Sequence, residues 1–149
     1  MKKSLFAIAL VCGILSLNAT SAKAEISQRT LQSFHSVFAE AKHVKWMEFP
    51  DHYLVSFSQN DVLVKASYDR DGNLLNSIRY YKEQRLPLNI LCKVKKENPN
   101  RNIEIVTEVS NEEGVVYFIQ LKDKKGWTIL KSDASGNLEL TDKFQDANR

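Results

Sequence analysis

Hydrophobic and polar residues alternate along much of the chain after position 43. Tyr53, Val55 and Phe57 alternate with Leu54, Ser56 and Ser58, and the row Val62, Val64, Ala66 and Tyr68 alternates with Leu63, Lys65 and Ser67. This period of two is typical of strands that bury one face. On this pattern we predict eight strands, at residues 44–49, 53–58, 62–68, 74–81, 103–109, 115–121, 127–131 and 138–141.

Two stretches show a helical period instead. The first follows the helix-capping residue Ser27 and is predicted to end at His43-Val44; its apolar residues at i, i+3, i+4 and i+7 are Phe34, Val37, Phe38 and Ala41. The second begins at Leu86-Pro87, where proline is favoured because its missing N–H costs nothing in a first turn. Its stripe is Pro87, Ile90, Leu91 and Val94.

A turn sequence occurs twice, 64 positions apart. Residues 69–74 and 133–138 both read D-x-x-G-N-L, and Tyr53 and Tyr117 have the same spacing. A calcium loop is the alternative, but Gly72 comes too early and no bidentate acid follows, so we interpret the motif as a turn. We therefore predict two repeats, residues 25–85 and 86–143, and a frayed polar tail, 144–149.

This order of elements predicts the fold class. Short turns between successive strands make each neighbouring pair antiparallel. A helix followed by four strands, twice, predicts an α+β protein with one curved antiparallel sheet and both helices on one face. Because a unit of about sixty residues buries little apolar surface alone, the two units are expected to share one core. The opposite face is expected to stay open.

The N-terminus has the features of an export signal. Lys2-Lys3 precede the apolar run Leu5–Leu17, and Ala22-Lys23-Ala24 matches the small-x-small pattern of a signal peptidase site. We expect residues 1–24 to be removed, with no transmembrane segment in the mature chain. The mature protein is expected to be periplasmic or secreted.

Removal of the signal changes the charge and the cysteine count. The 21 basic residues fall to 18, equal to the 18 acidic residues, because Lys2, Lys3 and Lys23 leave. A neutral chain does not support nucleic-acid binding. Cys12 also leaves, so Cys92 remains alone and no intramolecular disulfide is expected.

Residues suited to catalysis are few. His35, His43 and His52 have no partners at metal-ligand or triad spacing. Cys92 fits a small hydrophobic residue of a helix better than a nucleophile. We expect no catalytic residues, no metal and no cofactor, so the protein is interpreted as not an enzyme.

Aromatic residues beyond the needs of the core suggest a binding surface. Tryptophan, tyrosine and arginine are enriched at interaction hot spots. Either Tyr80 or Tyr81 must point away from the helices, because neighbouring strand residues face opposite sides. The residues we select as candidate partner contacts are Trp127, Tyr81, Arg79 and Phe118.

Several of these motifs resemble the exported PepSY-like proteins of Bacteroidetes. The matching residues are Val44-x-Trp46, Tyr53-x-Val55-x-Phe57, Ala66-x-Tyr68-Asp69-x-Asp71-Gly72-x-Leu74-Leu75 and Leu86-Pro87-x-x-Ile90. The resemblance implies a beta-lactamase-inhibitor-like fold of tandem helix-plus-four-strand repeats. Departures are Asn98-Pro99, where an aromatic residue usually precedes the proline, and a second unit without a tryptophan equivalent to Trp46. The resemblance carries no catalytic residues.

These observations favour an exported, non-enzymatic binding module. We expect it to bind or inhibit another envelope or extracellular protein through the open sheet face, as a monomer or weak homodimer. The alternative is a small-molecule or envelope-glycan binding protein, which would need a deep pocket between sheet and helices.

Overall fold

The computed structural model describes residues 25–145. The expected signal peptide, its cleavage site and residues 146–149 of the tail lie outside this range. The elements are α1 (Gln28–Val37), β1 (Lys42–Glu48), β2 (His52–Gln59), β3 (Val62–Asp69), β4 (Leu74–Tyr81), a short 3-10 helix η1 (Glu83–Arg85), α2 (Leu88–Glu97), β5 (Asn102–Asn111), β6 (Gly114–Asp123), β7 (Gly126–Asp133) and β8 (Leu138–Gln145).

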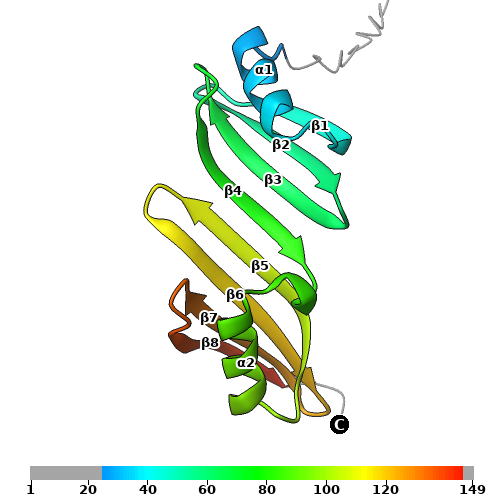
Figure 1. Cartoon of the computed structure of the whole chain (residues 1–149), viewed down its shortest axis with the longest axis vertical. Coiled ribbons are helices and arrows are strands. Elements are labelled where there is room, and N and C mark those ends of the chain that lie inside the picture. The colour runs from blue at the N-terminus through cyan, green and yellow to red at the C-terminus, as the bar shows by residue number, and fades with distance from the viewer. Residues whose placement is uncertain (1–24, 146–149) are drawn as a thin grey trace, which may run out of the picture.

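The eight strands form one antiparallel sheet in chain order, so the predicted fold class is confirmed. The β4–β5 pair joins the two halves, with Tyr81 opposite Val106 and Arg79 opposite Glu108. Strands β1 and β8 are the two edges. Figure 1 shows α1 at the β1–β2 end of the sheet and α2 at the β7–β8 end. Neither helix in residues 25–145 is long and apolar enough to cross a membrane.

The first helix packs through one fully buried aromatic residue. Phe34 is 0% exposed, and its ring centroid lies 5.3 Å from that of Trp46 in β1 and 5.1 Å from that of Phe57 in β2. Both contacts are edge-to-face, the arrangement that the charge distribution of aromatic rings favours. The prediction that the apolar stripe of this helix packs on the sheet is thus correct for Phe34 but wrong for Val37, whose side chain is 65% exposed.

The second helix covers the other end of the same face. Ile90 and Val94 are buried and belong to one apolar cluster with Val106, Ile119 and Leu121. Pro87 stands immediately before the helix as its N-cap. The preceding 3-10 turn was not predicted, and it brings Leu86, 5% exposed, into the core.

The two D-x-x-G-N-L turns have the same geometry. The Asn73 backbone N–H donates to Asp69 Oδ1 at 2.8 Å, and that of Asn137 donates to Asp133 Oδ1 at 2.9 Å. Gly72 and Gly136 have φ angles of +85° and +87°, which favour glycine. Hydrogen bonds within the turns lower the pKa of both aspartates. The Asn73 side chain is the largest cause for Asp69, and the Asn137 backbone N–H is the largest cause for Asp133.

Three predicted boundaries are wrong. Helix α1 ends at Val37 rather than near His43, and Phe38 leaves the helical conformation with φ −120° and ψ 52°. His43 lies instead in β1, with φ +55° next to an irregularity in the β1–β2 pairing. Strand β8 continues to Gln145, because residues 142–145 pair with β7. The tail from residue 144 is therefore ordered strand through Gln145.

Candidate interaction surface

The strand register assigns each side chain to one face of the sheet. Phe57, Val64, Arg79, Glu108, Tyr117 and Ser132 are successive cross-strand partners, and this row shares the face that α1 and α2 cover. The next row consists of Ser58, Leu63, Tyr80, Thr107, Phe118 and Lys131 and lies on the opposite face. We name that opposite side the open face, since both described helices lie on the other side.

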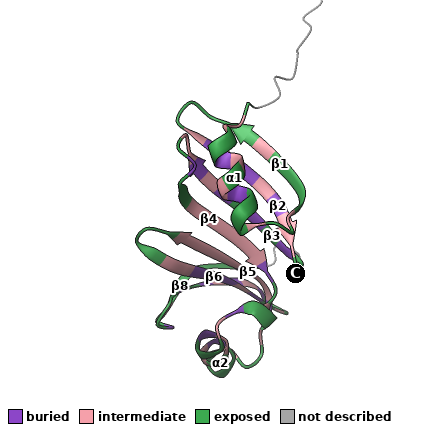
Figure 2. Cartoon of the chain, turned by 45° about the horizontal axis from the view of Figure 1, so that its top comes forward, coloured by how far each residue is buried: buried purple, intermediate pink, exposed green. Residues whose placement is uncertain are grey.

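The apolar side chains of the open face form a band that is densest on β4 to β8 and is interrupted by Ser56 and Ser58 on β2 and by Lys65 and Ser67 on β3. Tyr80 and Phe118 are half-buried by their neighbours on the same face, while Leu63 is 45% and Phe144 54% exposed. Figure 2 shows this intermediate burial along the central strands β4 and β5. The apolar members of the face are Met47, Leu54, Leu63, Ile78, Tyr80, Ile105, Val109, Val116, Phe118, Trp127, Ile129 and Phe144. Large exposed apolar patches with polar residues around them mark interaction sites.

Four lysines lie around the apolar band. Lys65 Nζ is 5.9 Å from the Tyr80 ring centroid, and Lys122 Nζ is 4.6 Å from that of Trp127. Lys45 and Lys131 complete the set by register. None of the four takes part in an ion pair within the described range. These four lysines lie on β1, β3, β6 and β7.

Acidic residues on the open face lie at its margins. Glu139 and Asp142 belong to the edge strand β8. Asp69 and Asp133 lie at strand ends, and their carboxylates accept hydrogen bonds inside the two turns. Glu139 lies opposite Lys131 in the register, whereas Lys45, Lys65 and Lys122 have no carboxylate as a direct cross-strand partner.

The four predicted contact residues divide between the two faces. Phe118 and Trp127 lie on the open face. Tyr81 and Arg79 lie on the helix-bearing face, and Tyr81 is 4% exposed. The structure thus corrects the expectation for this strand, because Tyr80 rather than Tyr81 points to the open side. The sequence pattern offered two adjacent tyrosines and no signal for choosing between them.

Tyr81 and Arg79 belong to a polar cluster at the junction of the two halves. The Tyr81 hydroxyl donates to Glu108 Oε2 at 2.6 Å, and Arg79 Nη1 lies 2.9 Å from Glu108 Oε1. Burial, and then the bond to Glu108, raises the pKa of Tyr81 well above its usual value. Burial raises the pKa of the neighbouring Tyr117 in the same direction. The cluster connects β4 to β5, so its role is to hold the halves together.

The residues considered for catalysis remain apart. His52 Nδ1 is 2.7 Å from Asp51 Oδ1 in an exposed turn, and this contact lowers the pKa of Asp51. His43 Nδ1 is 3.1 Å from the Ser58 hydroxyl, at the other end of β2. Cys92 is a free cysteine, exposed on α2. Across residues 25–145 no group of three metal-binding side chains converges.

A polar groove lies beside the end of α2. Its volume is about 740 Å³, and it is lined by Glu97, Asn98, Pro99, Asn100, Arg101, Asp123, Lys124, Lys125 and Lys143. Arg101 is fixed by Asp123 Oδ2 at 3.0 Å from its Nε and by Thr128 Oγ1 at 2.6 Å from its Nη1. The groove is open to solvent and polar, so it differs from the deep apolar pocket that most small ligands require.

Comparison with known proteins shows the fold. No protein-family model matches the sequence, and no curated protein matches it. The structure is similar to a BLIP-like protein from Bacteroides fragilis, with a TM-score of 0.64 and 16% identity over 86% of this chain and 94% of that one. A presumed periplasmic protein from Bacteroides eggerthii has a TM-score of 0.59 and 12% identity over 78% and 90% of the two chains. A DUF2874 family protein from Bacteroides ovatus has a TM-score of 0.60 and 14% identity over 78% and 89%. The chain therefore shares the fold of a BLIP-like protein and of DUF2874 family proteins.

Proposed function

We propose that the protein is an exported, non-enzymatic binding module whose open face binds an acidic surface of another envelope or extracellular protein. The observation that carries this proposal is the apolar band of the open face with four lysines that form no ion pair within residues 25–145, on a face that neither described helix covers. Aromatic residues supply binding energy at such surfaces. The lysines select for a partner of opposite charge and speed its association.

The size of the open face suits a protein partner. Eight strands spaced about 4.8 Å apart span about 34 Å, and eight residues along a strand span about 26 Å. Their product, roughly 900 Å², compares with about 800 Å² buried on each side of a typical protein interface. Small ligands bind in concave pockets, so a face of this width favours a macromolecule.

The export and repeat interpretations support the same proposal. The signal-like N-terminus and the structural likeness to a presumed periplasmic protein both favour the periplasm or the exterior. Residues 25–85 and 86–143 have the same element order and matching turns, as expected of a duplicated unit of the PepSY-like kind. The BLIP-like name of one structural neighbour makes inhibition of the partner the form of binding to test first.

The test uses the secreted protein as bait for envelope proteins, with open-face variants as comparison. The double variant Phe118→Ala, Trp127→Ala should weaken binding of each captured partner at least tenfold. Lys65→Glu with Lys131→Glu should slow association, and the effect should shrink at high salt. Leu88→Ala is the matched control, because Leu88 is 73% exposed on α2, away from the open face. Unchanged capture by a folded Phe118, Trp127 double variant would refute the proposal.

The groove beside α2 favours a second candidate function, the binding of an anionic small molecule or envelope glycan. Lys124, Lys125 and Lys143 line the groove with amide side chains, with Glu97 and with Arg101, which is paired with Asp123. A glycan that binds there should raise the melting temperature of the protein. The rise should be lost in Lys143→Ala and kept in the Phe118, Trp127 double variant.

A further inference from the structure

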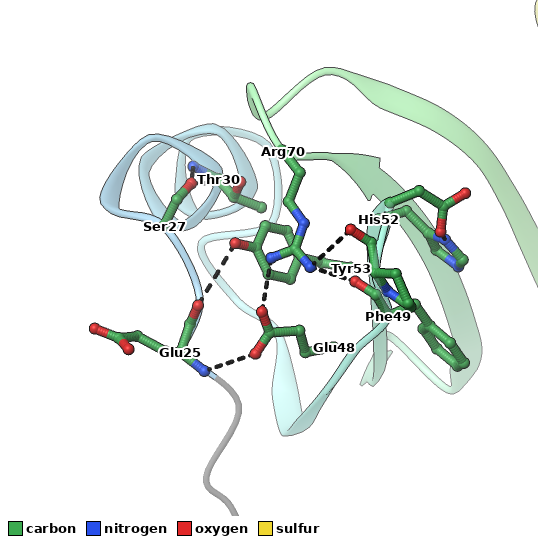
Figure 3. Close-up of polar contacts among 10 residues, drawn as sticks. Glu25, Ser27, Thr30, Glu48, Phe49, His52, Tyr53 and Arg70 are labelled. Carbon is green, nitrogen blue, oxygen red and sulfur yellow. Dashed lines mark hydrogen bonds and ion pairs between the residues drawn. The ribbon is translucent and has the colours of Figure 1, made fainter.

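A polar cluster surrounds the first described residue of the chain (Figure 3). Its centre is Arg70, which follows β3 and whose guanidinium carbon lies 4.4 Å from the Tyr53 ring centroid. Arg70 Nη1 is 2.7 Å from Glu48 Oε1, and Nη2 donates to the carbonyls of Phe49 and Pro50. These contacts fix the Glu48 carboxylate through one oxygen and leave the other free to accept.

The free oxygen of Glu48 faces the backbone nitrogen of Glu25. Glu25 N donates to Glu48 Oε2 at 3.2 Å, and the Tyr53 hydroxyl donates to the Glu25 carbonyl oxygen at 3.5 Å. Figure 3 shows the Glu25 side chain pointing away from this cluster, so the backbone of Glu25 makes the contacts. Two residues later, the Ser27 side chain accepts from the Thr30 N–H at 3.2 Å and caps α1. The chain is thus held to the fold from Glu25 onward.

The sequence places a cleavage motif at the same residue. Ala22-Lys23-Ala24 ends immediately before Glu25. Hydrolysis of the Ala24–Glu25 bond adds the hydroxyl of water to the Ala24 carbonyl carbon and a proton to the Glu25 nitrogen. The released α-amine takes up a further proton at neutral pH, since its ordinary pKa is about 7.7–8.0.

We propose that Glu48 is the receptor for the processed N-terminus: export creates an α-ammonium group at Glu25, and the Glu48 carboxylate binds it opposite Arg70. Cleavage then converts a neutral amide donor into a charged one at a contact that already exists. The amide N–H bond to the Glu48 carboxylate is already charge-assisted, and cleavage adds a full positive charge to the donor, which makes the contact an ion pair. Glu48 would bridge two cations, one from the start of the mature chain and one from the β3–β4 turn.

This assignment makes the position of cleavage matter to the folded protein. Each residue added before Glu25 moves the amine up to about 3.5 Å along the chain and restores a neutral amide at Glu25. An N-terminal extension therefore removes the ion pair and leaves the remainder of the cluster in place. The hydrogen bond from Arg70 is the main cause of the lowered pKa of Glu48, as expected of a carboxylate that stays charged.

The test begins with the full precursor, exported by a Gram-negative host and purified from its periplasm. Intact mass and N-terminal sequencing should give Glu25 as the first residue. A second precursor carries Gly-Ser inserted between Ala24 and Glu25, and each is also made with Glu48→Gln. The insertion should lower the melting temperature by about 1–3 °C in the protein with Glu48 and by about zero in the E48Q variant.

Chemical modification of the α-amine gives an independent readout. Acylation at neutral pH should be several-fold slower in the protein with Glu48 than in the E48Q variant. Glu112→Gln, in the β5–β6 hairpin, is the matched control and should leave the rate unchanged. A first residue other than Glu25 would overturn the proposal. Equal acylation rates with and without Glu48, or an insertion that costs the same in both backgrounds, would overturn it as well.

Discussion

The paired glycines of the two D-x-x-G-N-L turns allow a quantitative comparison of the halves. Gly72 and Gly136 share a left-handed backbone, with φ +85° and +87°. An alanine in this conformation costs about 1–2 kcal/mol at either site. The surroundings differ, because a Cβ at Gly72 would lie 3.2 Å from backbone atoms of Arg29 and Thr30 in α1. At Gly136 the nearest atom would be Asn89 Nδ2, a side-chain atom, at 3.4 Å.

The two substitutions should therefore differ in size. Gly136→Ala should cost about 1–2 kcal/mol of unfolding free energy, since the Asn89 side chain can rotate away. Gly72→Ala should cost about 1–3 kcal/mol more, because helix backbone cannot move without disturbing the packing of Phe34. For a domain of this size, each kcal/mol lowers the melting temperature by about 4 °C.

Urea unfolding of the protein and its variants measures the difference. Equal m-values would show that the variants unfold to similar states, so that the midpoints report stability. Ser135→Ala, in the second turn, is the control and should change stability by less than about 0.5 kcal/mol. A Gly136→Ala variant as unstable as Gly72→Ala would refute the inferred contact between the first turn and α1.

Two further predictions concern the core and the junction. Phe34→Ala should lower the free energy of unfolding in urea by about 3–5 kcal/mol, because Phe34 is 0% exposed and packs against Trp46 and Phe57. The control Leu88→Ala should lower it by less than about 0.5 kcal/mol. Tyr81→Phe should cost about 1–2 kcal/mol at pH 8, since Glu108 loses a donor. The pKa of Tyr81 is raised in the folded protein, so the neutral hydroxyl contributes its full stability below about pH 10 and loses that contribution as the pH rises further. The Tyr81→Phe variant should therefore lose less stability than the unchanged protein between pH 9 and 11. A steeper alkaline loss in Tyr81→Phe would contradict this reasoning.

The elements predicted best are those with strong local signals. Strand β3, and strand β2 as far as Ser58, alternate between buried and less buried residues, so their period of two was readable from the sequence. The two turns were readable because Asp, Gly and Asn at fixed spacing satisfy a particular backbone shape. Helix α1 was extended too far because Phe38 and Ala41 pack against the core from outside the helix, which prolongs the apolar stripe.

Strand β8 was shortened for the opposite reason. It is an edge strand, and residues 139–145 are exposed, so neither face selects apolar residues with a period of two. The central strand β4 posed a related problem. Its residues 76–80 are all of intermediate burial, because the helices lie toward the two ends of the sheet. Nothing local distinguished Tyr80 from Tyr81.

The amino-acid order alone was enough for the strands, the turns and the succession of helix and four strands, because each depends on residues within a few positions of one another. The identity of the open face, the pairing of Arg79 and Tyr81 with Glu108, and the contact of Glu25 with Glu48 emerged from the assembled sheet. These contacts join residues more than twenty positions apart, and a shift of one residue in strand register would exchange the two faces. Local pattern cannot specify such a register, which is set by packing across all eight strands.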